Sequence, residues 1–298
     1  MNIVKLVSIF LLLGVSACGS SDNKPEEVII EEVIVVEEIP IENEAFCSEI
    51  SCEENNKFII KQIYNDVING LNMGLIASIY NEGFIQHNTN ITDGVTGQEA
   101  YFTEMTTNSP EHIATIKHIV ADGDYVAVHW HYAENPTNEF VGNAHINLYK
   151  LYDSKIVEHW NVSMQPNRMT ASGNSVFSDL YIYPANTLPN NDTSIEEENK
   201  IMVTEFYLDL FNNKNLDLIG SLVDSNYLQH NYWVPNGSKA LLDFVSGGET
   251  GGLSIFLTLA EDDIVWTFSG SGTTNLATVD LWRVDNNINK IVEHWDVF

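Results

Sequence analysis

The sequence predicts an α+β protein that contains two copies of one domain. Two motifs occur twice and in the same order: residues 155–162 (KIVEHWNV) return as 290–297 (KIVEHWDV), and residues 86–88 (QHN) return as 229–231. In both copies helical patterns come first and strand patterns follow, which is typical of α+β domains. Each copy is long enough to bury a core of its own and too long for a solenoid repeat.

The repeat and the composition before it divide the chain into five segments. These are a signal peptide at 1–17, an acidic tether at 18–56, a first domain at 57–183, a linker at 184–195 and a second domain at 196–298.

The predicted signal peptide carries the basic residue Lys5 near its start. An apolar run at 6–13, too short to span a bilayer, follows, and small residues end the segment. Its Val-Ser-Ala-Cys ending resembles the lipobox of bacterial lipoproteins. This resemblance implies that Cys18 is lipidated and anchors the chain in the bacterial cell envelope. Gly19 stands where inner-membrane lipoproteins typically carry Asp, which implies the outer membrane. The alternative is an ordinary secreted protein with a chance cysteine.

The tether carries twelve acidic residues and one lysine between residues 20 and 54. Such a run repels itself and stays extended, so we expect a spacer, with a partner-binding arm as the alternative. Cys47 and Cys52 form an isolated pair outside the cytoplasm, which favours a disulfide over a metal site. The net charge of −29 and the lack of a basic patch argue against nucleic acid as a partner.

Each copy opens with an amphipathic helix whose apolar residues recur at spacings of three and four. These residues are Phe58, Ile59, Ile63, Tyr64, Val67 and Ile68 in the first copy and Ile201, Met202, Phe206, Tyr207 and Leu210 in the second. Further helices are predicted at 71–80, 98–106, 216–222 and 238–245. Strands are predicted at 114–120, 125–132, 144–151 and 155–163, and at 255–259, 263–269, 276–284 and 290–298. Alternation within the strands predicts antiparallel sheets with one face toward a core.

Four motifs carry a family resemblance. Residues 227–231 (YLQHN), 122–131 (DGDYVAVHWH), 279–283 (VDLWR) and 290–297 look like the SnoaL-like branch of the NTF2-like superfamily. The most similar group comprises predicted aldol-condensation enzymes, whose trailing Gly-Asn-x-x-Phe is present at 173–177. The resemblance implies a cone in which a curved antiparallel sheet wraps around N-terminal helices and leaves an apolar pocket. That superfamily holds cyclases, isomerases, hydrolases, dehydratases and binding modules, so the fold is a weak guide to the reaction.

Two acids of the second copy are the strongest catalytic candidates. A hairpin centred near Ile288 would place Asp280 opposite Asp296 on one face of the sheet. Two facing carboxylates in a partly apolar pocket cannot both ionise easily, so one becomes a usable acid or base near neutrality. The resemblance assigns the acid/base role to Asp296 and a second polar role to Asp280. The alternative is a solvated pair at a sheet edge.

The first copy carries Asn147 and Asn161 at the same two positions, and an amide cannot take up a proton at neutral pH. It keeps His129 and His131, which residues 268–270 (FSG) replace in the second copy. The two copies have therefore diverged in complementary ways.

Histidines are the other candidate site residues. The expected ligand-binding set is His87, His129, His131, His159 and His294. The imidazoles of the first four could also be ligands of a metal ion, because alternate residues of a strand have a known ligand spacing. We expect instead that these histidines line a polar pocket and that no metal is bound. By resemblance His87 and His230 line the pocket mouth, where His230 could share protons; the alternative is a buried histidine that satisfies a turn.

Trp160 and Trp295 should face away from the candidate site, because they alternate with its residues along a strand. We expect them in packing or near an interface at which the two domains dock sheet to sheet as an intramolecular pseudo-dimer.

The expected function is that of a membrane-tethered, polyketide cyclase-like acid–base enzyme. The sequence lacks a nucleophilic serine elbow, a phosphate-binding glycine loop and a dinucleotide fingerprint, so no cofactor is expected. Asp296 would move a proton next to the carbonyl of a small hydrophobic molecule, with His230 and Asp280 holding the enolate. The alternative is a non-catalytic lipoprotein that binds such a molecule in degenerate pockets, and a third reading is an interaction scaffold.

Overall fold

The computed structural model describes residues 50–166, 170–185, 187, 192–248, 252–271 and 275–298, all within one compact unit. The predicted signal peptide, Cys18, Cys47 and most of the tether lie outside these residues. Cys52 is disulfide-bonded to a cysteine outside them, so its pairing with Cys47 stays a prediction. Within the described part, every helix is too short or too polar to cross a membrane.

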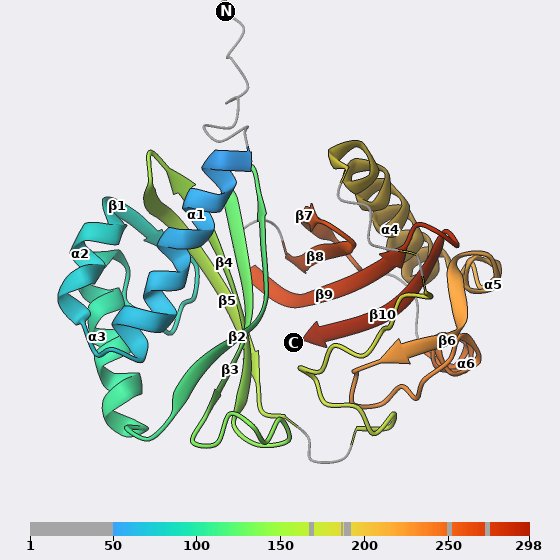
Figure 1. Ribbon diagram of the computed structural model, residues 1–298, viewed down its shortest axis with the longest axis horizontal. Helices are drawn as coiled ribbons and strands as arrows, with labels where there is room; N and C mark the ends of the chain where they lie inside the picture. Colours follow the sequence, from blue (N-terminus) through green and yellow to red (C-terminus); the bar gives the residue numbers. More distant parts are fainter. Residues whose placement is uncertain (1–49, 167–169, 186, 188–191, 249–251, 272–274) are drawn as a thin grey trace, which may run out of the picture. The chain divides into compact units, whose positions relative to one another are not determined.

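The first half of the unit, here called repeat 1, packs helices against one face of a five-stranded sheet (Figure 1). Its helical elements are α1 (Ile50–Gln62), η1 (Ile63–Ile68), η2 (Met73–Leu75), α2 (Ile76–Ile79) and α3 (Gly94–Asn108). Its strands are β1 (Tyr80–Gln86), β2 (Ile113–Asp122), β3 (Tyr125–Ala133), β4 (Asn143–Tyr152) and β5 (Lys155–Met164), in the order β1-β5-β4-β3-β2.

The second half, repeat 2, has the same plan. Its helices are α4 (Thr193–Asn213), α5 (Asp217–Leu222) and α6 (Ser238–Gly247). Its strands are β6 (Val223–Gln229), β7 (Ile255–Glu261), β8 (Ile264–Ser271), β9 (Asn275–Asp285) and β10 (Lys290–Val297), in the order β6-β10-β9-β8-β7. The predicted α+β class is confirmed.

Each sheet has one strand more than the sequence predicted. β1 and β6 end in the repeated Gln and run parallel to β5 and β10, whereas all other neighbours are antiparallel. The same local device ends both strands: Asp93 Oδ1 accepts from the backbone N–H of Gln86, and Asn236 Oδ1 accepts from that of Gln229, both at 2.8 Å. A short strand that pairs only with the far end of its repeat leaves little local pattern to recognise.

Alternation along the strands divides each sheet into two faces. Toward its helices each repeat buries its own hydrophobic cluster, which includes Tyr64 and Trp130 in repeat 1 and Phe206 and Trp282 in repeat 2. A third cluster takes residues from both sheets and includes Trp160 and Trp295, as expected for tryptophans that face away from the helices.

Residues 170–183, here called the connecting segment, follow the last strand of repeat 1 but bond to repeat 2. The Trp295 indole N–H donates to the Ser178 carbonyl at 2.8 Å, and the Tyr183 hydroxyl donates to Asp263 at 2.8 Å. The predicted first domain, 57–183, therefore ends in a segment held by the other repeat. The helices also begin before the predicted boundaries, α1 at Ile50 and α4 at Thr193.

A buried carboxylate fastens this segment. Glu293 is fully buried and accepts from the backbone N–H groups of Leu180 and Tyr181 at 2.8 and 3.1 Å. It also accepts from Arg283 at 2.6 Å and contacts the His230 ring nitrogen Nε2 at 2.9 Å. The guanidinium balances the charge of the carboxylate, without which burial would be costly.

Glu293→Gln should lower the free energy of unfolding by about 3 kcal/mol, because it leaves Arg283 with one anionic partner fewer in a buried place. Chemical denaturation of the full chain measures this. The matched control is Glu158→Gln at the equivalent position of repeat 1, where the carboxylate is 24% exposed and pairs with His87 and Lys150. There the cost should be about 1 kcal/mol or less. Equal losses in the two variants would show that Glu293 has no special role.

Candidate active site

The candidate site is a set of buried polar side chains on the helix-facing side of the repeat 2 sheet. Asp280 and Asp296 are direct partners in the β9–β10 ladder, so their predicted placement is confirmed. Their exposed fractions are only 3% and 7%. Both carboxyl groups are therefore buried. The alternative that they form a solvated pair at a sheet edge is wrong.

His294 connects Asp280 to the repeated glutamine. Gln229 Oε1 accepts from the backbone N–H groups of His230 and Asn231 at 2.9 and 3.0 Å, which identifies this atom as the amide oxygen. His294 Nδ1 lies 2.8 Å from the same oxygen and must therefore carry a hydrogen.

The other ring nitrogen of His294, Nε2, shows that the site holds a further proton. His294 Nε2 lies 3.1 Å from Asp280 Oδ1. A hydrogen bond between them needs a proton, held either by the imidazolium or by the carboxylic acid, because Nδ1 already bears its own. The His294–Asp280 pair therefore stores one proton inside the site.

Tyr207 of α4 completes the surroundings of Asp280. Its hydroxyl donates to Asp280 Oδ2 at 2.8 Å. Burial, together with the nearby Asp280 charge, raises the pKa of Tyr207 well above its ordinary value, so the hydroxyl stays a donor. Both oxygens of Asp280 are thus engaged.

Asp296 has one engaged and one unpartnered oxygen. Asn231 Nδ2 donates to Oδ2 at 2.5 Å, whereas Oδ1 is buried with no hydrogen-bond partner among the described residues. Burial raises the pKa of Asp296 to about 6; attraction to His294 opposes this rise and repulsion from Asp280 adds to it. A carboxyl group with such a pKa can exchange its proton near neutral pH.

Repeat 1 has the same positions without the acids. Asn147 and Asn161 are ladder partners, and Asn88 Nδ2 donates to Asn161 Oδ1 at 2.8 Å, as Asn231 does to Asp296. Here the amide nitrogen of Gln86 faces His159 Nδ1 at 2.9 Å, and burial lowers the pKa of His159 to about 3. This copy stores no such proton and has no carboxylate at these positions.

His230 was predicted to join Asp280 and Asp296 in the catalytic set, but the structure places its ring apart from both acids. Its ring lies on the opposite face of the sheet, stacked on Trp295 with centroids 4.9 Å apart and bonded to Glu293. The residues before and after it, Gln229 and Asn231, contact the site instead. The reason is alternation: neighbouring residues of an extended chain point to opposite sides.

His129 and His131 also face away from the helix side, so they do not share a pocket with His159. Both rings pack on Phe177 of the connecting segment, and His129 Nδ1 lies 3.2 Å from His118 Nδ1. Both are buried against the connecting segment, and their ligand-binding role stays a prediction. His87 does line a pocket, described below.

The sequence reasoning missed Tyr207, Gln229 and Asn231. Tyr207 fits the apolar spacing of its helix, and only the fold shows that its hydroxyl reaches β9. The sequence does carry a signal for Gln229 and Asn231, because the whole Gln-His-Asn motif is repeated.

A metal ion is the other occupant that these groups permit. One ligand atom each from Asp280, His294 and Asp296 lie within 4.8 Å of one another. Four of the nearby atoms are already hydrogen-bonded: Asp280 Oδ2 to Tyr207, Asp296 Oδ2 to Asn231, and Asp280 Oδ1 and His294 Nε2 to each other. We therefore interpret the set as a proton-transfer site.

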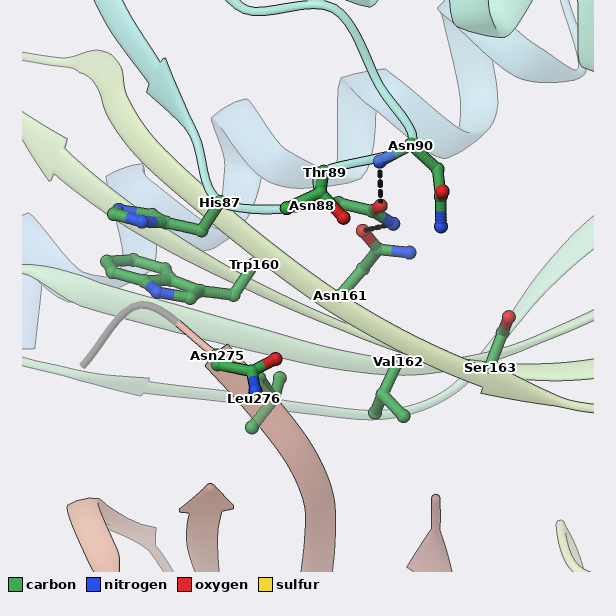
Figure 2. Close-up of a pocket in the computed structure, with 10 residues that line it drawn as sticks. All are labelled: His87, Asn88, Thr89, Asn90, Trp160, Asn161, Val162, Ser163, Asn275 and Leu276. Carbon is green, nitrogen blue, oxygen red and sulfur yellow. Dashed lines mark hydrogen bonds between the residues drawn. The ribbon is translucent and has the colours of Figure 1, made fainter. Parts of the chain in front are cut away.

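Two pockets of the described residues are lined by other groups than Asp280 and Asp296. One, of about 270 Å³, lies at the end of β1 and contains Asn88 and Asn161 (Figure 2). The other, of about 330 Å³, is lined by charged groups of both repeats, among them Lys117 and Arg283. Because Asp280 and Asp296 are buried, a ligand that reaches Asp296 must displace side chains that now cover it.

Residues 58–170 match the SnoaL-like polyketide cyclase family, so repeat 1 is a SnoaL-like domain. No curated protein matches the chain. IdmH from Streptomyces antibioticus is 20% identical over 36% of this chain and 91% of its own, with a TM-score of 0.31. A SnoaL-like polyketide cyclase from Agrobacterium tumefaciens is 13% identical over 37% of this chain and 91% of its own, with a TM-score of 0.32. An NTF2-like protein from Mesorhizobium loti is 19% identical over 37% of this chain and 90% of its own, with a TM-score of 0.30.

Asp296→Asn should change how stability depends on pH. Because folding raises the pKa of Asp296 from 3.8 to about 6, the wild-type chain should lose stability relative to the variant as pH rises through this range. The largest expected difference is about 3 kcal/mol, from about 1.4 kcal/mol per unit. Asn is accommodated, since Asn161 occupies the equivalent place beside Asn88.

Chemical denaturation between pH 4 and 8 provides the measurement. Asp243→Asn, which changes an exposed carboxylate on α6, is the matched control and should follow the wild-type curve. Parallel curves for the wild type and Asp296→Asn would mean that Asp296 ionises normally.

Proposed function

We propose that the chain is a cofactor-free acid–base enzyme of the cyclase, isomerase or aldol type, with its active site in repeat 2. The observation that carries this proposal is the unpartnered Asp296 Oδ1, buried beside a stored proton. A SnoaL-like domain in repeat 1 and the matching strand order of repeat 2 support a second domain of the same kind.

In the proposed reaction Asp296 acts first as a base. The ionised carboxylate removes a proton from the carbon next to a substrate carbonyl and becomes a carboxylic acid, and the C–H electron pair forms an enolate. The proton held by His294 and Asp280 lies close enough to hydrogen-bond to the enolate oxygen. Return of the Asp296 proton to another atom of the substrate gives an isomer. Attack of the enolate carbon on a second carbonyl of the same molecule forms a ring, and the alkoxide oxygen that results takes the proton from Asp296, which restores the carboxylate.

The surroundings favour a small and largely apolar substrate. Phe206, Tyr227 and Trp282 belong to the cluster that surrounds the site. Two exposed aromatic residues mark the side from which a substrate would enter: Trp233 is 61% exposed, Phe298 is 36% exposed, and their rings stack 5.2 Å apart. Trp233 donates its backbone N–H to Asn231, the partner of Asp296.

A specific observation also favours the alternative, a protein that binds a hydrophobic molecule without turnover. Repeat 1 carries amides, Asn147 and Asn161, at both acid positions, so one of the two copies lacks the acid–base groups. Turnover therefore decides between the two functions.

We also propose that the enzyme is tethered to the outer membrane of a bacterial cell envelope. The support is the signal-like segment at 1–17, the cysteine that follows it and the acidic tether.

Deuterium exchange next to the carbonyl of small apolar ketones tests the catalytic proposal. Asp296→Asn should lower the exchange rate about 100-fold or more, because general base catalysis typically contributes that much. In the wild-type protein the rate should rise with pH through an apparent pKa near 6, which belongs to the coupled acids as a group.

Asp243→Asn again serves as the control and should exchange at the wild-type rate. Exchange that survives Asp296→Asn but disappears on replacement of His129 and His131 would place the chemistry in the wrong repeat. Exchange abolished by a chelator would indicate a metal at Asp280, His294 and Asp296, and no exchange with any ketone would favour the binding protein.

Cys18→Ser should leave an uncleaved precursor, because lipidation of the cysteine precedes removal of a lipoprotein signal. Mass spectrometry of the membrane and soluble fractions measures this, with Cys52→Ser as the matched control that should still be processed. A soluble mature protein that starts at another residue would contradict the anchor.

A further inference from the structure

The pocket in repeat 1 lies where strand pairing stops. β1 pairs with β5 only as far as His159, and beyond that point residues 87–90 run past the uncovered side of β5. Figure 2 shows Asn88 and Asn161 hydrogen-bonded to each other on one side of the pocket, with Asn275 and Leu276 of β9 on its other side. Both repeats therefore build the pocket.

The lining is polar but contains no aspartate, glutamate, lysine or arginine. Four of its residues are asparagines, namely Asn88, Asn90, Asn161 and Asn275. Its single titratable group is His87, whose ring nitrogen Nε2 is engaged by Glu158 at 2.8 Å. A pocket of this kind offers no counter-charge to an ion, and the net charge of −29 repels anions further.

Amides suit one class of neutral ligand particularly well. An asparagine side chain presents two donors and an acceptor in one plane, and a hydroxyl group is both donor and acceptor. Neighbouring hydroxyls can therefore bond to both ends of one amide. Ser163 and Thr89 add hydroxyl groups, and Val162 and Leu276 supply apolar contact for C–H groups.

The volume of the pocket limits the size of the ligand that it can hold. Its volume of about 270 Å³ falls below the roughly 300 Å³ at which pockets for drug-sized ligands begin. One ring with its substituents is a suitable size, whereas a fused polycyclic molecule is too large.

Asn88 and Asn161 are more exposed in repeat 1 than the equivalent residues are in repeat 2. The equivalent Asn231 and Asp296 are each 7% exposed, whereas Asn88 and Asn161 are half-buried. The replacement of the acid by Asn161 removes the charge and leaves an amide pair with free hydrogen-bonding capacity at the pocket surface.

We propose that this pocket binds a neutral polyhydroxylated molecule, a single sugar ring or cyclic polyol. It is a second site, distinct from the acid–base site and independent of whether that site is catalytic.

Isothermal titration of the full chain tests this, in a detergent without a sugar headgroup. The probes are glucose, galactose, mannose, N-acetylglucosamine and inositol, with glucuronate and cyclohexanone as charged and apolar counter-probes. At least one neutral probe should bind saturably, and Asn161→Ala should weaken its binding about ten-fold, the effect of losing about 1.4 kcal/mol of hydrogen bonding.

Asn275→Ala guards against misfolding, because this residue is exposed on the opposite wall, and it should weaken the same probe several-fold. Asn226→Ala, an exposed asparagine of β6 outside the pocket, and Asp296→Asn should both leave binding unchanged. The proposal is overturned if no neutral probe binds, if neither pocket variant weakens binding, or if glucuronate or cyclohexanone binds more tightly than every neutral probe.

Discussion

Two-residue alternation along β10, a strand buried on both faces, is the constraint on which the rest of this structure depends. Residues 291–297 of this strand are all buried. His294 and Asp296 face the helices of repeat 2 and form the acid–base site, while Glu293 and Trp295 face the other way and hold the connecting segment. A slip of one residue in register would exchange these two sets and destroy both the site and the contact.

The two faces neutralise their buried acids by different means. Glu293 is paired with the fixed guanidinium of Arg283, and this pair holds the connecting segment. In the part of the chain that the structure describes, Asp280 and Asp296 pair with no lysine or arginine, and their charge is offset by the proton that His294 and Asp280 share. A guanidinium cannot leave, but a proton can move. This difference is what makes the helix-facing acids suited to proton transfer and Glu293 suited to holding the fold.

Duplication allows the two copies to specialise. The repeat that matches the cyclase family carries amides at both acid positions, and an amide cannot act as a general base. Those amides lie at the surface of a neutral pocket, whereas the acids of repeat 2 are enclosed. Asn161 and Asp296 are nearly the same shape, so one substitution changes the chemistry while the hydrogen bond to the neighbouring asparagine is kept. The proposed sugar site and the proposed catalytic site are thus two versions of one local structure.

The sequence by itself determined the features that depend on local pattern. Helix and strand periods predicted the α+β class, and the short turn between the last two strands predicted that Asp280 faces Asp296, because hairpin register follows from turn position. Only the tertiary structure decided which face each histidine of a motif takes. The side chain of His230 turns away from the acids because β6 pairs in parallel with a strand far along the chain, and long-range pairing leaves no local signal. Likewise, His129 and His131 lie against the connecting segment, a contact set by packing between distant residues.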